Sequence, residues 1–240
     1  MKLNLSKLLV LVNILFIIFP CFSIGEQIRV DYPYNVWDEK ELREIVKDYE
    51  NKYSVEKSTE VLKILGIAYH NLAALGNREV AKHSVRYLEK LHNTLPGDIE
   101  TLAYLGSATT ILGRDSFNPI NKIRHVSDGT KLIDKAIKNE PNNIVMRILR
   151  ISNSRALPGF FGRYKFVEID LEFLLEFAEK EPLLFPSGLL AEVYYLKGEV
   201  LKDKEEINSA QEYWRKAAEV SPESPSGKKA SERLKKAYTQ

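Results

Sequence analysis

A three-position pattern that ends at a proline occurs four times along the chain, and it constrains the fold more than any other feature. Each occurrence places side chains on one helical face, and the following proline ends that helix because it lacks an N–H and clashes with the preceding turn. A single helix of this length does not bury its apolar face alone, so each needs a packing partner. The four occurrences are Ala210, Trp214 and Ala217 before Pro222; Ser84, Leu88 and Leu91 before Pro96; Gly129, Ile133 and Ala136 before Pro141; and Asp170, Leu174 and Phe177 before Pro182.

A second spacing pattern precedes three of these helices and predicts their packing partners. Its glycine removes the side chain at the point where two antiparallel helices must approach closely. One helix pair still leaves an apolar face bare, so the pairs are predicted to stack on one another. The pattern is formed by Leu62, Leu65, Gly66 and Tyr69; by Leu102, Leu105, Gly106 and Thr109; and by Tyr194, Lys197, Gly198 and Leu201.

With these spacings, Thr59 to Pro222 resembles the tetratricopeptide repeat family, whose helix–turn–helix units are about 34 residues long. The resemblance implies an all-α fold, a right-handed α-solenoid of about four helix pairs with capping helices at both ends. The first cap begins at Asp38, which with Glu41 has the sequence of a capping box. One helical repeat domain is therefore predicted for residues 26–240. Its units are expected at residues 59–96, 99–141, 143–182 and 187–222, and its C-terminal cap at residues 226–238.

Extra residues, relative to that unit length, fall near the turn between the two helices of a unit. In the first unit they are interpreted either as a longer turn or as longer helices. In the second and third units, the breaker-rich segments 113–122 and 157–165 predict surface loops. Turns of a solenoid line one edge, so Phe117, Phe160 and Phe161 are candidate binding residues there. The alternative for Phe160 and Phe161 is burial beneath the loop as a small satellite core.

The first helix of the third unit has an apolar stripe on one side and arginines on the other. Arg147 and Arg150 stand where the family has bulky apolar residues, Arg155 follows in the same helix, and Arg163 lies in the next loop. Two interpretations remain open, and they are compatible. The arginines form a pocket for a carboxylate or phosphate ligand, or they pair with acidic residues because buried charges need partners. The acidic candidates are Glu168, Asp170 and Glu172.

Residues 1–25 have the features of an export signal. Two lysines precede the apolar run 8–19, which is too short to span a bilayer comfortably. We therefore expect cleavage after Ser23 or Gly25 and a location in the periplasm, the cell envelope or the extracellular space.

A lipid anchor on Cys21 is the alternative to simple cleavage, and an uncleaved anchor is a third possibility. Pro20 argues against acylation because it stands where a lipobox has a small residue. Cys21 is the only cysteine, so no disulfide or thiol chemistry is expected in the folded body.

Charge and motifs argue against several function classes. The chain has 35 basic and 33 acidic residues, and the two N-terminal lysines account for the excess, so no nucleic-acid binding is predicted. No metal-binding spacing, nucleophile motif or phosphate-binding glycine loop occurs, so no enzyme activity, metal or cofactor is expected. His70 is interpreted as a polar residue on a helix face. No stable transmembrane span is predicted.

Two function classes remain. The first is an adaptor outside the cytoplasm that binds a partner protein or peptide in the groove of stacked helix pairs. The second is an envelope protein that binds a small anionic ligand and is associated with a transporter, with the arginines and loops framing its pocket. The first is favoured, by analogy with the family.

Overall fold

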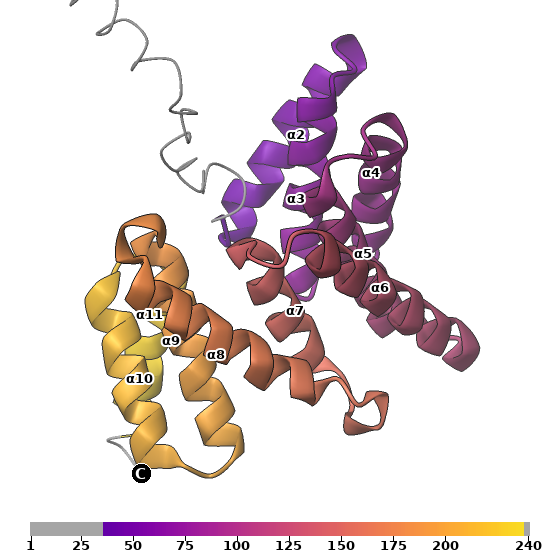
Figure 1. Cartoon of the computed structure of the whole chain (residues 1–240). Helices are drawn as coiled ribbons and strands as arrows, with labels where there is room; N and C mark the ends of the chain where they lie inside the picture. The colour runs from indigo at the N-terminus through magenta and orange to yellow at the C-terminus, as the bar shows by residue number, and fades with distance from the viewer. Residues whose placement is uncertain (1–35, 238–240) are drawn as a thin grey trace, which may run out of the picture.

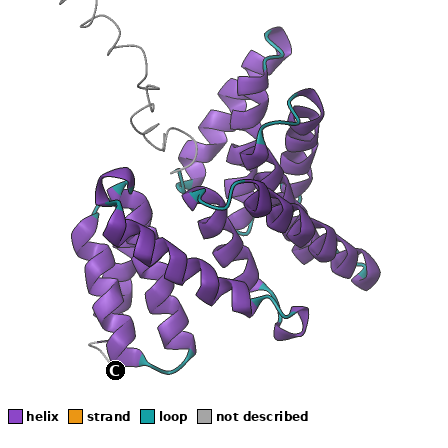
Figure 2. Cartoon of the chain, viewed as in Figure 1, coloured by secondary structure: helices purple, strands orange, loops and turns teal. Residues whose placement is uncertain are grey.

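The computed structural model describes residues 36–237, where the backbone is helical and contains no strand (Figure 2). The predicted all-α fold class is confirmed. The predicted export signal lies outside the described residues. Two short 3-10 helices are η1 (Gly159–Phe161) and η2 (Pro182–Leu184). The α-helices are α2 (Glu39–Val55), α3 (Thr59–Ala74), α4 (Ala81–Thr94), α5 (Ile99–Asp115), α6 (Pro119–Asn139), α7 (Ile144–Ala156), α8 (Tyr164–Lys180), α9 (Ser187–Asp203), α10 (Ile207–Val220) and α11 (Pro225–Ala237).

Side-chain caps explain where several helices begin. Asp38 accepts a hydrogen bond from the backbone N–H of Glu41 at 2.9 Å, which is the aspartate half of the predicted capping box. Ser58 caps α3, Asp98 caps α5 and Asn143 caps α7 in the same way. Each cap provides an acceptor for an N–H group that has no partner inside its helix.

The helices pack in chain order. Each helix from α2 to α10 contacts the next one, and contacts also join α3 to α5, α5 to α7 and α9 to α11. Figure 1 shows α2 to α6 at the upper right, α8 to α11 at the lower left, and α7 between the two groups. The packing therefore places the first helices of three successive pairs, α3, α5 and α7, next to one another.

Apolar cores lie between neighbouring helices rather than at one centre. Leu65 belongs to a core shared by α2, α3 and α4, and Ile133 to a core that extends from α3 to α7. Leu174 belongs to a core shared by α7, α8 and α9, and Trp214 to a core shared by α9, α10 and α11. The four cores follow one another along the chain, and successive cores share helices.

Glycine is required where the helices of a pair approach most closely. A β-carbon on Gly106 of α5 would lie 2.6 Å from the carbonyl oxygen of Gly129 in α6. A β-carbon on Gly198 of α9 would lie 2.5 Å from the indole of Trp214 in α10. Favourable contacts between carbon atoms are about 3.5–4.0 Å long, so any larger residue would force these helices apart.

The loop predicted at residues 113–122 is mostly helical, and this prediction is wrong. Helix α5 continues to Asp115 and α6 begins at Pro119, so only three residues connect them. The segment is rich in helix breakers, but Asn118 caps α6 and Pro119 occupies its first turn, where a missing N–H has no cost. Gly113 is buried within α5, where a β-carbon would lie 3.0 Å from a backbone oxygen of α6.

The other two insertions are largely connections between helices. In the first unit, residues 75–80 join α3 to α4, so the extra residues lengthen the turn. In the third unit, residues 157–163 form a loop that contains η1, and α8 begins at Tyr164, one residue before the predicted end of the loop. Gly162 has a φ of 63°, a left-handed conformation that glycine adopts without strain.

Candidate functional site

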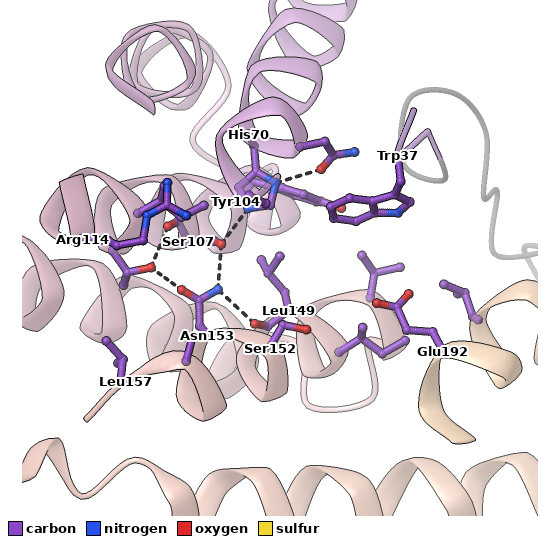
Figure 3. A pocket seen from close by; sticks show the side chains of 18 residues that line it. Trp37, His70, Tyr104, Ser107, Arg114, Leu149, Ser152, Asn153, Leu157 and Glu192 are labelled. Atoms are coloured by element: carbon purple, nitrogen blue, oxygen red, sulfur yellow. Dashed lines mark hydrogen bonds between the residues drawn. The ribbon is translucent and has the colours of Figure 1, made fainter. Parts of the chain in front are cut away.

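A pocket of about 280 Å³ lies on the face formed by the first helices of the pairs. Its lining comes from α3, α5, α7 and α9 and from Trp37, which precedes α2. Figure 3 shows Trp37 and Glu192 at one end and Arg114 at the other. Most of the lining surface is apolar, and it includes Ile111, Val145, Ile148, Leu149 and Leu189.

One wall of the pocket is a hydrogen-bonded polar network (Figure 3). The side-chain amide of Asn71 donates to the carbonyl oxygen of Val36 at 3.2 Å, so its own oxygen faces His70 Nδ1 at 2.9 Å. This arrangement assigns the ring proton to Nδ1. His70 Nε2 is then the acceptor for the hydroxyl of Ser107, whose oxygen lies 2.7 Å away.

Asn153 of α7 extends the network to a third helix. Its side-chain nitrogen donates to Ser107 Oγ at 2.7 Å and to the carbonyl oxygen of Leu149 at 3.1 Å. The side-chain oxygen of Asn153 accepts from the hydroxyl of Thr110. A continuous chain of hydrogen bonds therefore joins α3, α5 and α7 along the pocket wall.

His70 is buried and neutral. Its side chain is 3% exposed and lies edge-on to Tyr104, with ring centroids 5.1 Å apart. Burial lowers the pKa of His70 to about 4, and the hydrogen bond to Asn71 opposes this shift only partly. His70 therefore lies on a face of α3, and that face is buried because α5 covers it.

The order Asn71, His70, Ser107 is that of an orienting group, a base and a hydroxyl. Its surroundings are not those of a nucleophile, since Ser107 is 1% exposed and its oxygen already accepts from Asn153. A substrate carbon does not reach an oxygen that is covered in this way. We interpret the network as a structural wall that fixes the spacing of three helices.

The two charged groups at the ends of the pocket differ in their partners. Arg114 donates to the carbonyl oxygen of Ala73 at 2.9 Å and to the carboxylate of Asp115 at 2.7 and 3.0 Å. Glu192 forms neither a hydrogen bond nor an ion pair with any residue in the range 36–237. Burial raises the pKa of Glu192 to about 7, and the charge of Lys229 lowers it by a smaller amount.

The arginines predicted as ligand-binding groups lie outside this pocket and bind carboxylates of the protein. Asp170 is fully buried and accepts from Arg147 at 2.5 Å and from Arg150 at 2.7 Å through each of its oxygens. Aromatic rings cover both guanidinium groups, with Phe173 3.7 Å from the Arg147 group and Phe166 4.5 Å from the Arg150 group. Of the three acidic candidates, Asp170 is thus the one that pairs with these arginines.

The pKa directions separate these two arginines. Burial lowers the pKa of Arg147 despite its contact with Asp170. Burial acts in the same direction on Arg150, but Asp170 and Asp134 outweigh it and raise the pKa of that group. Arg150 is therefore the better compensated of the two buried charges.

Arg155 and Arg163 are also paired. Arg155 donates to Asp203 at 2.9 Å and to Glu199 at 3.3 Å, both on α9. Arg163 donates to both oxygens of Asp134 on α6, at 2.6 and 2.7 Å. These pairs connect helices that are distant in sequence, so they stabilise the packing of α7 and of the loop that follows it.

The three candidate phenylalanines lie in the connections of the second and third units. Phe117, between α5 and α6, is 87% exposed, and Phe160 in η1 is 77% exposed. Phe161 is half-buried, with its ring centroid 4.4 Å from that of Phe160. A satellite core is therefore wrong for Phe160, which packs against its neighbour and faces solvent. None of the seven predicted site residues lines the pocket in the described part of the chain.

The pocket residues that the sequence analysis missed had a visible signal. His70 and Asn71 interrupt the apolar segment 67–74 in α3, and Ser107 directly follows the close-approach residue Gly106 in α5. Polar side chains in the most apolar helices of a chain need buried partners, so they indicate either a network or a site.

Comparison of the chain with known protein families, with curated proteins and with solved structures finds no match. Across residues 36–237, no helix combines the length and the apolar character that crossing a membrane requires. The same residues contain no group of three or more histidine, cysteine or acidic side chains that is arranged to hold a metal ion.

Proposed function

We propose that this chain is a tetratricopeptide-like adaptor whose pocket on the first helices holds the anchoring side chain of a partner peptide or protein. The proposed architecture is a right-handed solenoid. It is supported by contacts between consecutive helices, by contacts between alternate helices, and by glycines at the close approaches. The proposed binding function itself rests on the pocket.

The shape and chemistry of the pocket suit an anchor. Its volume of about 280 Å³ is close to the lower end of the range for ligand pockets, and its apolar lining favours burial of an apolar stem. The side chains of the polar wall form hydrogen bonds with one another, so they fix the spacing of the helices and do not need a ligand as a hydrogen-bond partner. Since the lining comes from several helix pairs, an extended segment that crosses those helices would reach it.

The alternative, a small anionic ligand, has less support. It requires cationic groups that are free to bind, whereas Arg147, Arg150, Arg155 and Arg163 each pair with carboxylates of the protein. Arg114 is the arginine in the pocket lining, and it is bound to Asp115. We therefore propose the adaptor and treat anion binding as the second candidate.

The proposed location is outside the cytoplasm, because residues 1–25 carry the pattern of an export signal. N-terminal sequencing of the exported protein should give a start after Ser23 or Gly25. A start at Met1, or an acylated Cys21, would contradict cleavage without lipidation.

Blocking the pocket tests the proposed function. Ser152 is exposed and lines the pocket, so Ser152→Phe should fill it without disturbing the core. Ser54→Phe places the same side chain at an exposed position of α2 and is the matched control. Proteins from envelope extract that bind the wild type and the control variant, and that Ser152→Phe loses, would support the proposal. Equal capture by all three would refute it.

A further inference from the structure

The polar groups around the pocket can be sorted by whether they are already satisfied. His70, Asn71, Ser107 and Asn153 donate to and accept from one another. Arg114 is held by Asp115 and by a backbone carbonyl. These groups therefore have little capacity left for a ligand, and they do not determine the charge that the pocket accepts.

Among the charged lining residues of the described range, Glu192 differs from Arg114 because it has no such partner. Its carboxyl group points into the pocket near Trp37 (Figure 3). The side chain of Glu192 is half-buried, and no hydrogen bond or ion pair within residues 36–237 compensates the part of its carboxyl group that is withdrawn from water. Withdrawing a carboxylate from water without a partner costs free energy, and an incoming cation would offset that cost.

The ammonium group of one lysine of the protein already lies near this end of the pocket. Lys229 of α11 is exposed, and its Nζ lies 5.8 Å from the centroid of the Trp37 ring. The same charge is the one that acts on Glu192. An ammonium group is attracted both by the face of an indole ring and by a carboxylate, and Lys229 satisfies each of them only from a distance.

We propose that Glu192 and Trp37 make this end of the pocket a site for an alkylammonium group on an apolar stem. The stem would lie along Ile148 and Leu189 and the charge would meet Glu192. This chemistry is found in a lysine side chain of a partner and in a free amphipathic amine. The inference rests on the proposed function, since it names the chemistry of the anchor that the pocket holds.

Three probes with six carbon atoms each test the charge preference: hexylammonium, hexanol and hexanoate. Ligand-observed NMR titrations against the full mature chain would give their relative affinities. We expect hexylammonium to bind at least about tenfold more tightly than hexanol, and hexanoate to bind more weakly than both. Ser152→Phe should abolish binding of all three, which locates them in the pocket.

Glu192→Gln keeps the shape of the side chain and removes its charge. This variant should bind hexanol as the wild type does and should lose the preference for hexylammonium to within about twofold. Lys229→Ala removes the competing charge and should increase that preference. A preference that survives in Glu192→Gln would overturn the inference.

The failures of the two proposals are distinguishable. If none of the probes binds, the pocket does not hold an anchor and the proposed function fails with the inference. If hexanol binds as tightly as hexylammonium, the pocket stands and only the cation preference is wrong. A blocked Leu-Lys-Leu peptide that binds more tightly than hexylammonium would assign the cation to a protein partner, and the reverse order would assign it to a free amine.

Discussion

Asp170→Ala is the substitution from which we expect the largest loss of stability among the charged residues. Asp170 has no exposed surface, and the side chains of Arg147 and Arg150 are 10% and 9% exposed. Its two carboxylate oxygens accept three hydrogen bonds from these guanidinium groups. Removing the carboxylate leaves two positive charges buried next to each other, and α8 loses its polar connection to α7.

The expected magnitude follows from this burial. Breaking a buried ion pair by removing one partner costs about 3–5 kcal/mol, because the remaining charge is uncompensated. That is a large fraction of the roughly 5–15 kcal/mol that stabilises a typical domain. The matched control is Asp203→Ala, which removes a partner of Arg155 at a site where the two side chains are 26% and 38% exposed. Solvent screens such a pair, so the control should cost about 1 kcal/mol or less.

Urea denaturation followed by circular dichroism measures both variants as shifts in the unfolding midpoint. A triple variant, Arg147→Met with Arg150→Met and Asp170→Leu, provides a second test. It removes all three charges together, so its stability should return to within about 2 kcal/mol of the wild type. Equal losses for Asp170→Ala and Asp203→Ala would refute the reasoning. So would a triple variant that is less stable than Asp170→Ala.

Three further predictions concern packing, binding and pH. Gly106→Ala should cost about 1–3 kcal/mol in urea denaturation, because its β-carbon meets the backbone of α6. Gly97→Ala, which meets nothing within 4 Å, should change stability by about 0.5 kcal/mol or less. Phe160→Ala combined with Phe161→Ala should weaken binding of an identified partner at least about tenfold without loss of helical signal, if the exposed edge contributes to recognition. Since the pKa of His70 is about 4 in the fold and 6.5 in the unfolded chain, stability should fall by about 3 kcal/mol as the pH drops from 6.5 to 4. His70→Gln should remove that part of the pH dependence.

The helices could be predicted from the sequence because their signals are local. Asp38 caps the helix that it was expected to cap, and Gly106 and Gly198 lie at the close approaches that their spacing implied. The loop at residues 113–122 could not be predicted from composition. Asn118 and Pro119 are typical of loops, but they are equally typical of a helix start, and only the neighbouring helix decides between the two.

The candidate site was less predictable because it depends on contacts between distant residues. The pairing of Arg147 with Asp170 was one of two open interpretations, and choosing between them required the distance between α7 and α8. Glu192 gave no signal at all in the sequence, since a glutamate in a helix is most often solvated. Its significance comes from the pocket around it, which residues of four helices and Trp37 form together.

The polar residues of α7 make contacts on two sides of the helix, which is why their pattern in the sequence resembled a binding site. On one side, Arg147 and Arg150 are tied to α8 by Asp170, and on another, Ser152 and Asn153 line the pocket. The ion pairs hold the helix against α8, while Asn153 holds it at a fixed distance from α5 through Ser107. Polar contacts on both of these faces therefore add to the apolar packing that holds α7 in place. The arginines thus fix the position of the helix that forms one wall of the pocket.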